Sequence, residues 1–212
     1  MEILHSLVDL LFHIDVHLDY AIANYHSWTY LLLFLIIFVE TGLVIMPFLP
    51  GDSLLFAIGA FTARGSFEFW SISFLILSAA ILGDTINYAI GKYFGEKLFN
   101  MPESRLFNRN HLRKAHDFYE KHGAKTIILA RFVPIVRTFA PFVAGMGSMT
   151  YKRFMSYNVI GAAAWIFSFI PLGYFFGNLP YIKGNLKSVM LAIIFISILP
   201  GIIEYIRVKR KS

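Results

Sequence analysis

The sequence predicts an all-α integral membrane protein built as an inverted repeat, and three observations lead to this fold class. Of the 212 residues, 57% are hydrophobic, against roughly 45 to 50% in soluble domains. Mean hydropathy is +0.62. Apolar runs long enough to cross a bilayer alternate with shorter apolar segments, and two short sequence patterns recur at nearly one spacing. The length predicts a single domain, residues 1–212.

A full span needs about 20 helical residues, because the hydrocarbon core is about 30 Å thick. Four runs meet this length: 28–48, 69–92, 154–177 and 188–206. Residues 2–20 place apolar side chains at helical spacing, which predicts an amphipathic helix on the membrane surface. A helix packed on the cytoplasmic side is an equal alternative.

The basic residues predict the topology. Eight lie between Lys92 and Lys125, and four more lie at the C-terminus. Positive charge marks cytoplasmic loops, so we expect both of these regions and Lys152-Arg153 to be cytoplasmic. The N-terminus is expected on the same side. Nucleic-acid binding is disfavoured because the basic tail directly follows an apolar span.

Two apolar segments are too short or too broken to be spans. Residues 126–148 lie between basic regions on the same side, so the chain must return to the side it left. They are predicted to form a re-entrant hairpin, and 50–63 a second one that enters from outside. Hairpin-shaping residues are expected at Pro50, Gly51, Pro134, Pro141 and Gly145.

The recurring patterns predict a duplication. Phe48-Leu49-Pro50 recurs as Phe132-Val133-Pro134, and the Gly91 to Gly95 segment recurs as Gly173 to Gly177. The offsets are 84 and 82 residues; chance in a Phe- and Gly-rich chain is the alternative. We expect repeat 1 at about 28–95, a cytoplasmic linker helix at about 96–123 and repeat 2 at about 124–206. Inverted repeats of this kind place substrate where their broken helices meet.

Ionisable residues within apolar segments are the candidate functional residues. Glu40 lies well inside the first span, Asp52 at the start of the first hairpin, and Arg131 and Arg137 in the second. At membrane depth each arginine costs about 2.5 to 3.5 kcal/mol, so a functional role is the default interpretation. The planar guanidinium suits phosphate, and a carboxylate that competes with phosphate for arginine can drive transport.

Structural interpretations of these residues stay open. Asp52 could be only a helix cap, Glu40 could make one internal hydrogen bond, and the arginines could simply pair with both acids. Buried ion pairs seldom stabilise more than apolar packing does, which favours function. Asp84, Asn87 and Tyr88 form a secondary polar stripe on the 69–92 helix, for which local hydrogen bonding is as good an explanation.

Enzyme signatures are missing. The chain has no cysteine, no Gly-x-Ser-x-Gly, no His-Glu-x-x-His and no Walker loop. All seven histidines lie in 1–26 or 111–122, outside the expected spans. We expect no catalytic residues, no metal and no cofactor.

The chain resembles the DedA family of the VTT-domain superfamily. The resemblance is carried by Phe38 to Gly42, Pro47 to Phe56, Gly83 to Gly91, Phe118 to Gly123 and Ala130 to Gly147. It implies a multi-pass protein of the bacterial inner membrane in which Glu40, Asp52, Arg131 and Arg137 are functional. It also implies recycling of undecaprenyl phosphate or other phospholipids, linked to the proton motive force.

We therefore expect a flippase of lipid phosphates, with Arg131 and Arg137 binding the phosphate and Glu40 and Asp52 coupling it to protons. The expected partners are the lipid substrate, protons, anionic lipids at the cytoplasmic face and a second copy of the chain. Alternatives are a scramblase or flippase of other lipids, a proton-coupled cation antiporter and a non-transporting envelope scaffold.

Overall fold

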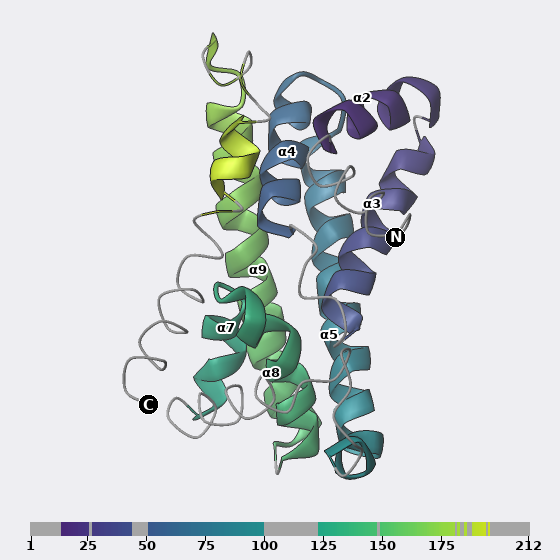
Figure 1. Ribbon diagram of the computed structural model, residues 1–212, viewed down its shortest axis with the longest axis vertical. Coiled ribbons are helices and arrows are strands. Elements are labelled where there is room, and N and C mark those ends of the chain that lie inside the picture. Colours follow the sequence, from purple (N-terminus) through teal and green to yellow (C-terminus); the bar gives the residue numbers. More distant parts are fainter. Residues whose placement is uncertain are drawn as a thin grey trace.

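The computed structural model is helical through the part of the chain that it describes, and two long helices form its centre (Figure 1). It describes residues 14–25, 27–43, 51–99, 123–147, 149–180, 182, 185, 188–193 and 195, and no strand occurs among them. α5 (Phe69–Phe99) and α9 (Tyr151–Phe176) are about 46 and 39 Å long at 1.5 Å per residue. Both are apolar enough to cross a membrane, which confirms long apolar helices at 69–92 and 154–177.

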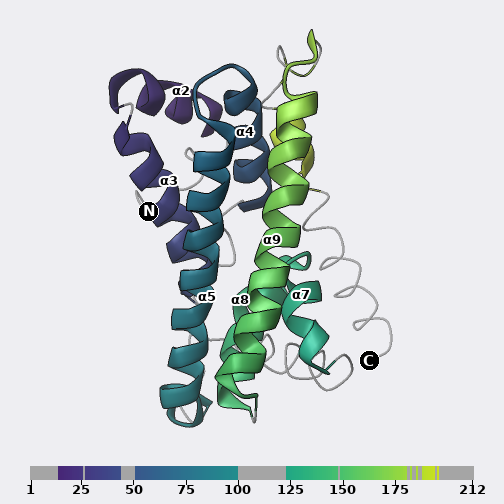
Figure 2. The ribbon, with the colours of Figure 1, turned by 180° about the vertical axis from the view of Figure 1, so that it is seen from behind.

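α5 and α9 lie side by side and run in opposite directions, as both ribbon views show (Figure 1, Figure 2). The end of α5 lies near the start of α9, where the Tyr88 hydroxyl donates a hydrogen bond of 2.6 Å to the carbonyl of Met149. Exposed Lys92, Lys152 and Arg153 are at this end. The structure thus brings together basic residues that the sequence places on one side of the membrane.

α3 (Ser27–Gly42) packs along only the first half of α5. It starts beside the start of α5, where the Tyr30 hydroxyl accepts a hydrogen bond of 3.1 Å from the backbone N–H of Glu68. It ends with Gly42 against Gly83. From the sequence we expect the 28–48 segment to start on the side opposite the start of α5, so this expectation is wrong for the described residues. Apolar length alone does not distinguish a helix that crosses from one that stops halfway.

α4 (Gly51–Ala63) is a single helix that starts beside Glu40 and packs along α9. Its first 12 residues are buried. α4 packs mainly on α9, as Figure 2 shows, and its apolar side chains share one core cluster with side chains of α3 and α5. Residues 44–50, with Pro50, lie outside the described part, so the hairpin over 50–63 stays a prediction.

The 126–148 segment forms two helices joined by a turn. η1 (Gly123–Lys125) leads into α7 (Thr126–Ala130), residues 131–133 turn, and α8 (Pro134–Met146) follows along α5. Pro134 occupies the first turn of α8, where the missing N–H is tolerated. Pro141 lies inside α8 without ending it, so the expectation that it interrupts the chain is wrong. The re-entrant path relative to a bilayer stays a prediction.

Each short helix packs on the long helix of the other half of the chain. α4 packs on α9 with the carbonyl of Phe56 at Gly173, and α8 packs on α5 with the carbonyl of Phe142 at Gly91. Phe142 follows Phe56 by 86 residues and Gly173 follows Gly91 by 82. Corresponding contacts therefore recur at nearly the spacing of the sequence patterns. An inverted duplication would produce this arrangement; the repeat boundaries stay a prediction.

The glycines at these contacts permit close approach of backbones. A Cβ at Gly59 would collide with the carbonyl of Ile170, and one at Gly145 would collide with the carbonyl of Tyr88. Gly145 was expected to shape a hairpin. It lies instead inside α8 and serves helix packing, which corrects that expectation.

The terminal segments are described only in part. α2 (Ile14–Tyr25) lies across the end at which α5 starts, where the Thr29 hydroxyl donates to the carbonyl of Ala21 at 2.9 Å (Figure 1). This is the end opposite Lys152, so a cytoplasmic α2 does not fit the positive-inside assignment. Residues 2–13 of the expected surface helix, 100–122 of the linker, and 194 and 196–206 of the expected last span lie outside the described part.

Candidate functional site

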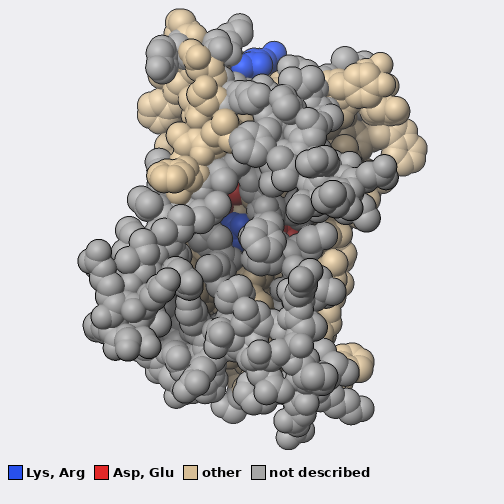
Figure 3. Space-filling view, in the orientation of Figure 1, with Lys and Arg blue, Asp and Glu red and all other residues tan. Residues whose placement is uncertain are grey.

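Five charged side chains are buried where the short helices start, midway along α5 and α9. They are Glu40, Asp52, Asp84, Arg131 and Arg137, each less than 9% exposed. In Figure 3, acidic and basic atoms are visible at mid-height, set back from the surrounding surface. Buried charges in an apolar protein are costly unless they are paired, so their partners define what the site can do.

Arg137 binds two carboxylates from the other half of the chain. Its Nη1 donates to Oδ1 of Asp52 at 2.9 Å, and its Nη2 forms an ion pair with Oε1 of Glu40. One planar guanidinium thus bridges α3 and α4 from the first turn of α8. Such a fork is a property of arginine that a lysine ammonium lacks.

Local sequence explains why these three groups meet. Asp52 is the second residue of α4, and Pro134 starts α8 one turn before Arg137, so both helices present their first turns to the site. Gly51 lies against Glu40: a Cβ at Gly51 would be 2.5 Å from both carboxylate oxygens. The expected role of Gly51 in shaping a hairpin is therefore accompanied by a second one, making room for the Glu40 carboxylate.

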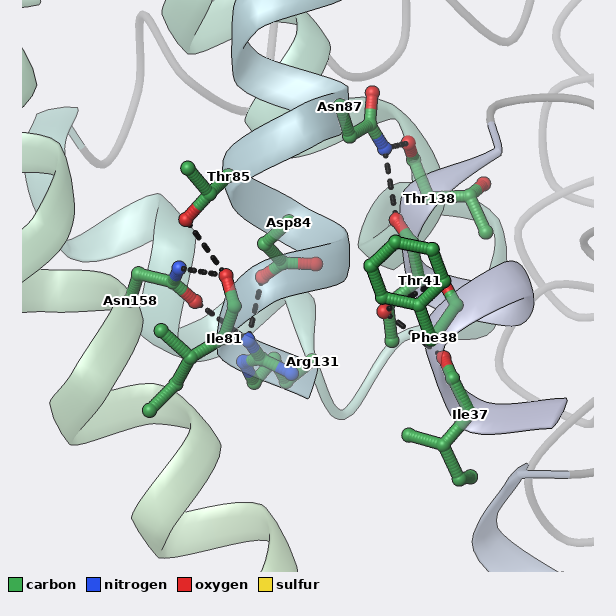
Figure 4. Close-up of polar contacts among 10 residues, drawn as sticks. All are labelled: Ile37, Phe38, Thr41, Ile81, Asp84, Thr85, Asn87, Arg131, Thr138 and Asn158. Atoms are coloured by element: carbon green, nitrogen blue, oxygen red, sulfur yellow. Dashed lines mark hydrogen bonds and ion pairs between the residues drawn. The ribbon is translucent and has the colours of Figure 1, made fainter. Parts of the chain in front are cut away.

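Arg131 has a separate set of partners (Figure 4). Its Nη2 donates to Oδ2 of Asp84 at 2.5 Å and to Oδ1 of Asn158 at 2.6 Å. Asn158 in turn donates from Nδ2 to the carbonyl of Ile81 at 3.1 Å. Arg131 at the end of α7 is thus held between α5 and α9, and it is not paired with Glu40 or Asp52.

Trp165 of α9 lies close to both arginines. The Cζ atoms of Arg137 and Arg131 are 4.8 and 5.8 Å from its ring centroid, within the range of a cation–π contact. Its Nε1 donates to Oδ1 of Asp52 at 2.7 Å. The indole therefore contacts both arginines and is hydrogen-bonded to one of the acids.

Several polar atoms of these side chains have no hydrogen-bond partner among the described residues. They are Oε2 of Glu40, Oδ1 of Asp84, Oδ1 of Asn87, Nε and Nη1 of Arg131 and Nε of Arg137. Three carboxylates and two guanidiniums give the site a net charge of −1 when all are ionised. One proton would make it neutral, and its spare donors belong mainly to Arg131.

Asn87 and Tyr88 tie the surrounding helices together. Asn87 Nδ2 donates to the carbonyls of Thr41 at 3.1 Å and Thr138 at 2.8 Å (Figure 4). Asp84 and Asn87 therefore bond to residues far away in the sequence, and local hydrogen bonding is the wrong explanation for both. Tyr88 contacts Phe154 with ring centroids 4.4 Å apart, which is a packing role near the end of the stripe.

Two residues of the site were not expected from the sequence. Asn158 is a lone amide in the apolar 154–177 run, and Trp165 is one of three tryptophans. A polar residue at membrane depth was a usable signal for Asn158. Trp165 carried none, because aromatic residues are frequent throughout this chain. Among the described residues, no group of three or more metal-binding side chains occurs.

Comparisons with known proteins agree with this picture. A model of the VTT domain matches residues 49–175, which include every charged residue of the site except Glu40. The chain is 57% identical over 214 aligned positions to Protein DedA of Escherichia coli K12, covering 100% of this chain and 98% of that protein.

More distant relatives extend the match. The Inner membrane protein YqjA of E. coli K12 is 31% identical over 180 positions, covering 85% of this chain and 81% of that protein. An uncharacterized membrane protein of Mycobacterium leprae is 44% identical over 168 positions, covering 79% and 75%. No solved structure matches the chain. Two of these three relatives are named as membrane proteins.

Proposed function

Because the chain belongs to the DedA family of VTT-domain membrane proteins, we propose that it is a transporter, not an enzyme, that carries a lipid phosphate across the bacterial inner membrane. The first candidate substrate is undecaprenyl phosphate, and movement is coupled to protons. The observation that carries the proposal is the buried site in which Arg137 is paired with two carboxylates and Arg131 with a third.

Phosphate binding would use both arginines. A phosphate monoester offers several charged oxygens, which match the planar donor set of a guanidinium. Arg131 already has Nε and Nη1 without partners among the described residues. Arg137 has both terminal nitrogens on carboxylates, so a phosphate must compete with Glu40 and Asp52 for it.

Protonation of Glu40 or Asp52 would decide whether Arg137 binds a carboxylate or the phosphate. When Glu40 or Asp52 takes a proton, it loses the negative charge that holds Arg137, and the arginine becomes available to phosphate. Loss of the proton restores the carboxylate, which then displaces the phosphate. The first turns of α4 and α8 also point their backbone N–H groups toward this region, an arrangement that favours anions.

The lipid tail would stay in the bilayer. α5 and α9 expose large apolar side chains, including Trp70, Phe74 and Phe167, as expected for surfaces in contact with lipid. The substrate's head group would reach the site from the side. Anionic lipids at the cytoplasmic face and a second copy of the chain are further proposed partners.

Three other functions fit parts of the site. A scramblase would move lipid without a gradient, a cation antiporter would need the acids more than the arginine forks, and a scaffold would need neither. The uncommitted donors of Arg131 favour an anionic substrate over a cation. The proton coupling separates a flippase from a scramblase.

The proposal is tested by translocation of labelled undecaprenyl phosphate in proteoliposomes, with and without an imposed pH gradient. Wild-type protein should translocate the lipid, and the rate should rise at least severalfold with the gradient. Glu40→Gln should abolish the response to the gradient. Glu68→Gln is the matched control, since this acid is exposed at the start of α5 and far from the site.

The outcomes separate the candidates. Translocation that ignores the gradient would identify a scramblase. No translocation in either condition would end the lipid-phosphate proposal, and cation movement in the same vesicles would support an antiporter.

A further inference from the structure

We propose that Asp84 is an exchangeable counter-ion: it occupies Arg131 in the resting state and is displaced from it by the phosphate of the substrate. This inference rests on the proposed function and adds to it a third carboxylate and a second point of competition. Asp84 is a positioning residue in this account, because it acts on substrate through Arg131.

The contact between Asp84 and Arg131 is incomplete in a way that suits exchange. A carboxylate and a guanidinium can form two parallel hydrogen bonds, but here only Nη2 and Oδ2 are joined. Oδ1 of Asp84 and Nε and Nη1 of Arg131 have no partner among the described residues, although both side chains are buried. The single hydrogen bond pairs the two buried charges in the resting state. It also leaves less to break than a two-bond contact would when phosphate displaces Asp84.

The nitrogen that Asp84 would release, Nη2 of Arg131, is also bonded to Asn158. Its Oδ1 lies 2.6 Å from Nη2, so Asp84 and Asn158 both accept from that single nitrogen. Asn158 is itself fixed to α5 through the carbonyl of Ile81. When Asp84 leaves, a neutral acceptor therefore remains on Nη2 and keeps the guanidinium in place while phosphate oxygens take the freed positions.

The two arginines differ in what a phosphate must displace. Arg137 is held by two carboxylates on separate nitrogens, whereas Arg131 is held by one carboxylate on one nitrogen. Arg131 is thus the arginine that a phosphate can engage first. Arg137 follows once Glu40 or Asp52 is neutralised.

A purely structural role for Asp84 makes the opposite prediction. If the pair only joins α5, α7 and α9, removal of the carboxylate leaves Arg131 buried without its anion and damages the site, so lipid binding would weaken or stay the same. If Asp84 competes with phosphate, its removal strengthens binding. The sign of the change in affinity decides between them.

Trp165 supplies a binding measurement that does not depend on transport. The other two tryptophans, Trp28 and Trp70, are 69% and 58% exposed, so a Trp28→Phe/Trp70→Phe background leaves a single indole, which lies close to both arginines. Its emission should change when phosphate enters. The probe is undecaprenyl phosphate titrated into the full-length protein in nanodiscs, and undecaprenol, which lacks the phosphate, is the control ligand.

Three variants change the number or the position of the carboxylates at Nη2 of Arg131. Asp84→Asn removes it and should bind the probe about tenfold more tightly, given the measured size of couplings between close charges. Asn158→Asp adds a second carboxylate to Nη2 and should bind about tenfold more weakly. Asp84→Asn with Asn158→Asp relocates the charge across Nη2 and should return to within about threefold of the parent. Asn158→Leu removes the amide without adding charge, so it separates the loss of the amide from the gain of the carboxylate in Asn158→Asp.

The results have distinct meanings. Asn158→Asp retains the native counter-ion, so it tests the idea even if Asp84→Asn does not fold. Unchanged or tighter binding in Asn158→Asp, or unchanged or weaker binding in folded Asp84→Asn, would overturn the inference while leaving the proposed function intact. No response of the parent to undecaprenyl phosphate would overturn both.

Discussion

At the scale of single residues, the site is governed by how each arginine uses its donors. Arg137 holds two acids from α3 and α4 with two different nitrogens, so it joins groups that a point charge cannot join equally well. By contrast, Nε and Nη1 of Arg131 have no hydrogen-bond partner among the described residues. A buried donor without a partner costs about 1 to 3 kcal/mol, and more when it is charged, so a fold that contains several of them is less stable than its packing allows. Such a cost is typical of functional sites.

Arg137→Lys tests the importance of the guanidinium fork. The lysine keeps the charge but loses one of two charge-assisted hydrogen bonds, each worth about 1.5 to 3 kcal/mol. We expect lipid translocation to fall by about tenfold to a hundredfold. Lys125→Arg, at an exposed position, is the control. Full translocation by folded Arg137→Lys would show that only the charge matters and would contradict the role assigned to the guanidinium fork.

Trp165→Phe tests the hydrogen bond that fixes Asp52. The phenyl ring keeps an aromatic face for both arginines but lacks the Nε1 donor that lies 2.7 Å from Oδ1 of Asp52. We expect the free energy of unfolding in detergent to decrease by about 1 to 2 kcal/mol. Trp28→Phe should change it little because Trp28 is exposed. An equal effect of both substitutions would contradict the assigned role.

The residues of the site could be predicted from the sequence only in part. Charges in apolar segments identified Glu40, Asp52, Arg131 and Arg137, and helical spacing identified Asp84. Their pairing could not be predicted, because Arg131 and Arg137 are six residues apart and the turn at 131–133 sends them to different partners. Trp165 could not be predicted because its role depends on the tertiary contacts that bring its indole close to both arginines and to Asp52.

At the scale of helices, close backbone contacts fix where the short helices start. The contact of α8 with α5 depends on Gly91 and Gly145, and that of α4 with α9 on Gly59 and Gly173. Each glycine faces backbone atoms, which cannot rotate aside as a side chain can. The depth of Asp52 and Arg137 in the molecule follows from these contacts.

Gly91→Ala and Gly173→Ala should therefore be strongly and similarly destabilising. In each, the new Cβ would collide with a backbone carbonyl, that of Phe142 or that of Phe56. We expect a loss of about 1 to 3 kcal/mol or more in unfolding free energy, and lower translocation because the site shifts. Gly147→Ala is the matched control, since Gly147 is exposed and its nearest atom would be 3.3 Å from the Cβ. Tolerance of either alanine would argue against the backbone contact.

The start of α5 is held by an acid whose effect depends on pH. Oε1 and Oε2 of Glu68 accept hydrogen bonds from the backbone N–H groups of Trp70, at 3.1 Å, and Ser71, at 2.5 Å. Hydrogen bonds from the Ser71 side chain and from these N–H groups lower the pKa of the exposed Glu68 below its ordinary 4.5.

This contribution to stability is complete above the unfolded pKa of about 4.5 and is lost as the pH falls through the lower folded value. The free energy of unfolding of Glu68→Gln should therefore be lower than that of the wild type at neutral pH, and the two values should converge in acid. A difference that persists unchanged to low pH would contradict the assignment.

Sequence patterns could predict which segments are helical better than where they lie. Apolar length identified α5 and α9, and Pro134 marked the start of α8. The half-length path of α3 could not be read from composition, because a helix that ends beside Gly83 in the protein interior is as apolar as one that crosses lipid. Pro141 shows the same limit: packing against α5 retains the helix although a backbone donor is missing.

At the scale of the whole molecule, each half of the chain completes the other. The first half provides Glu40, Asp52 and Asp84, and the second provides both arginines together with Asn158 and Trp165. Neither half could bury its charges alone. Any relative movement of the halves would change the pairing at the site, so under the proposed function substrate binding and protonation would be linked to the same rearrangement.

Coupling between lipid and protons is reciprocal by thermodynamic necessity. If a proton gradient drives the lipid phosphate, a gradient of the lipid must move protons. The most direct test uses proteoliposomes that contain a trapped pH-sensitive dye and no initial pH gradient, to which undecaprenyl phosphate is added from outside. Wild-type protein should change the internal pH, and Glu40→Gln should not. Lipid translocation by the wild type without any change of internal pH would contradict proton coupling.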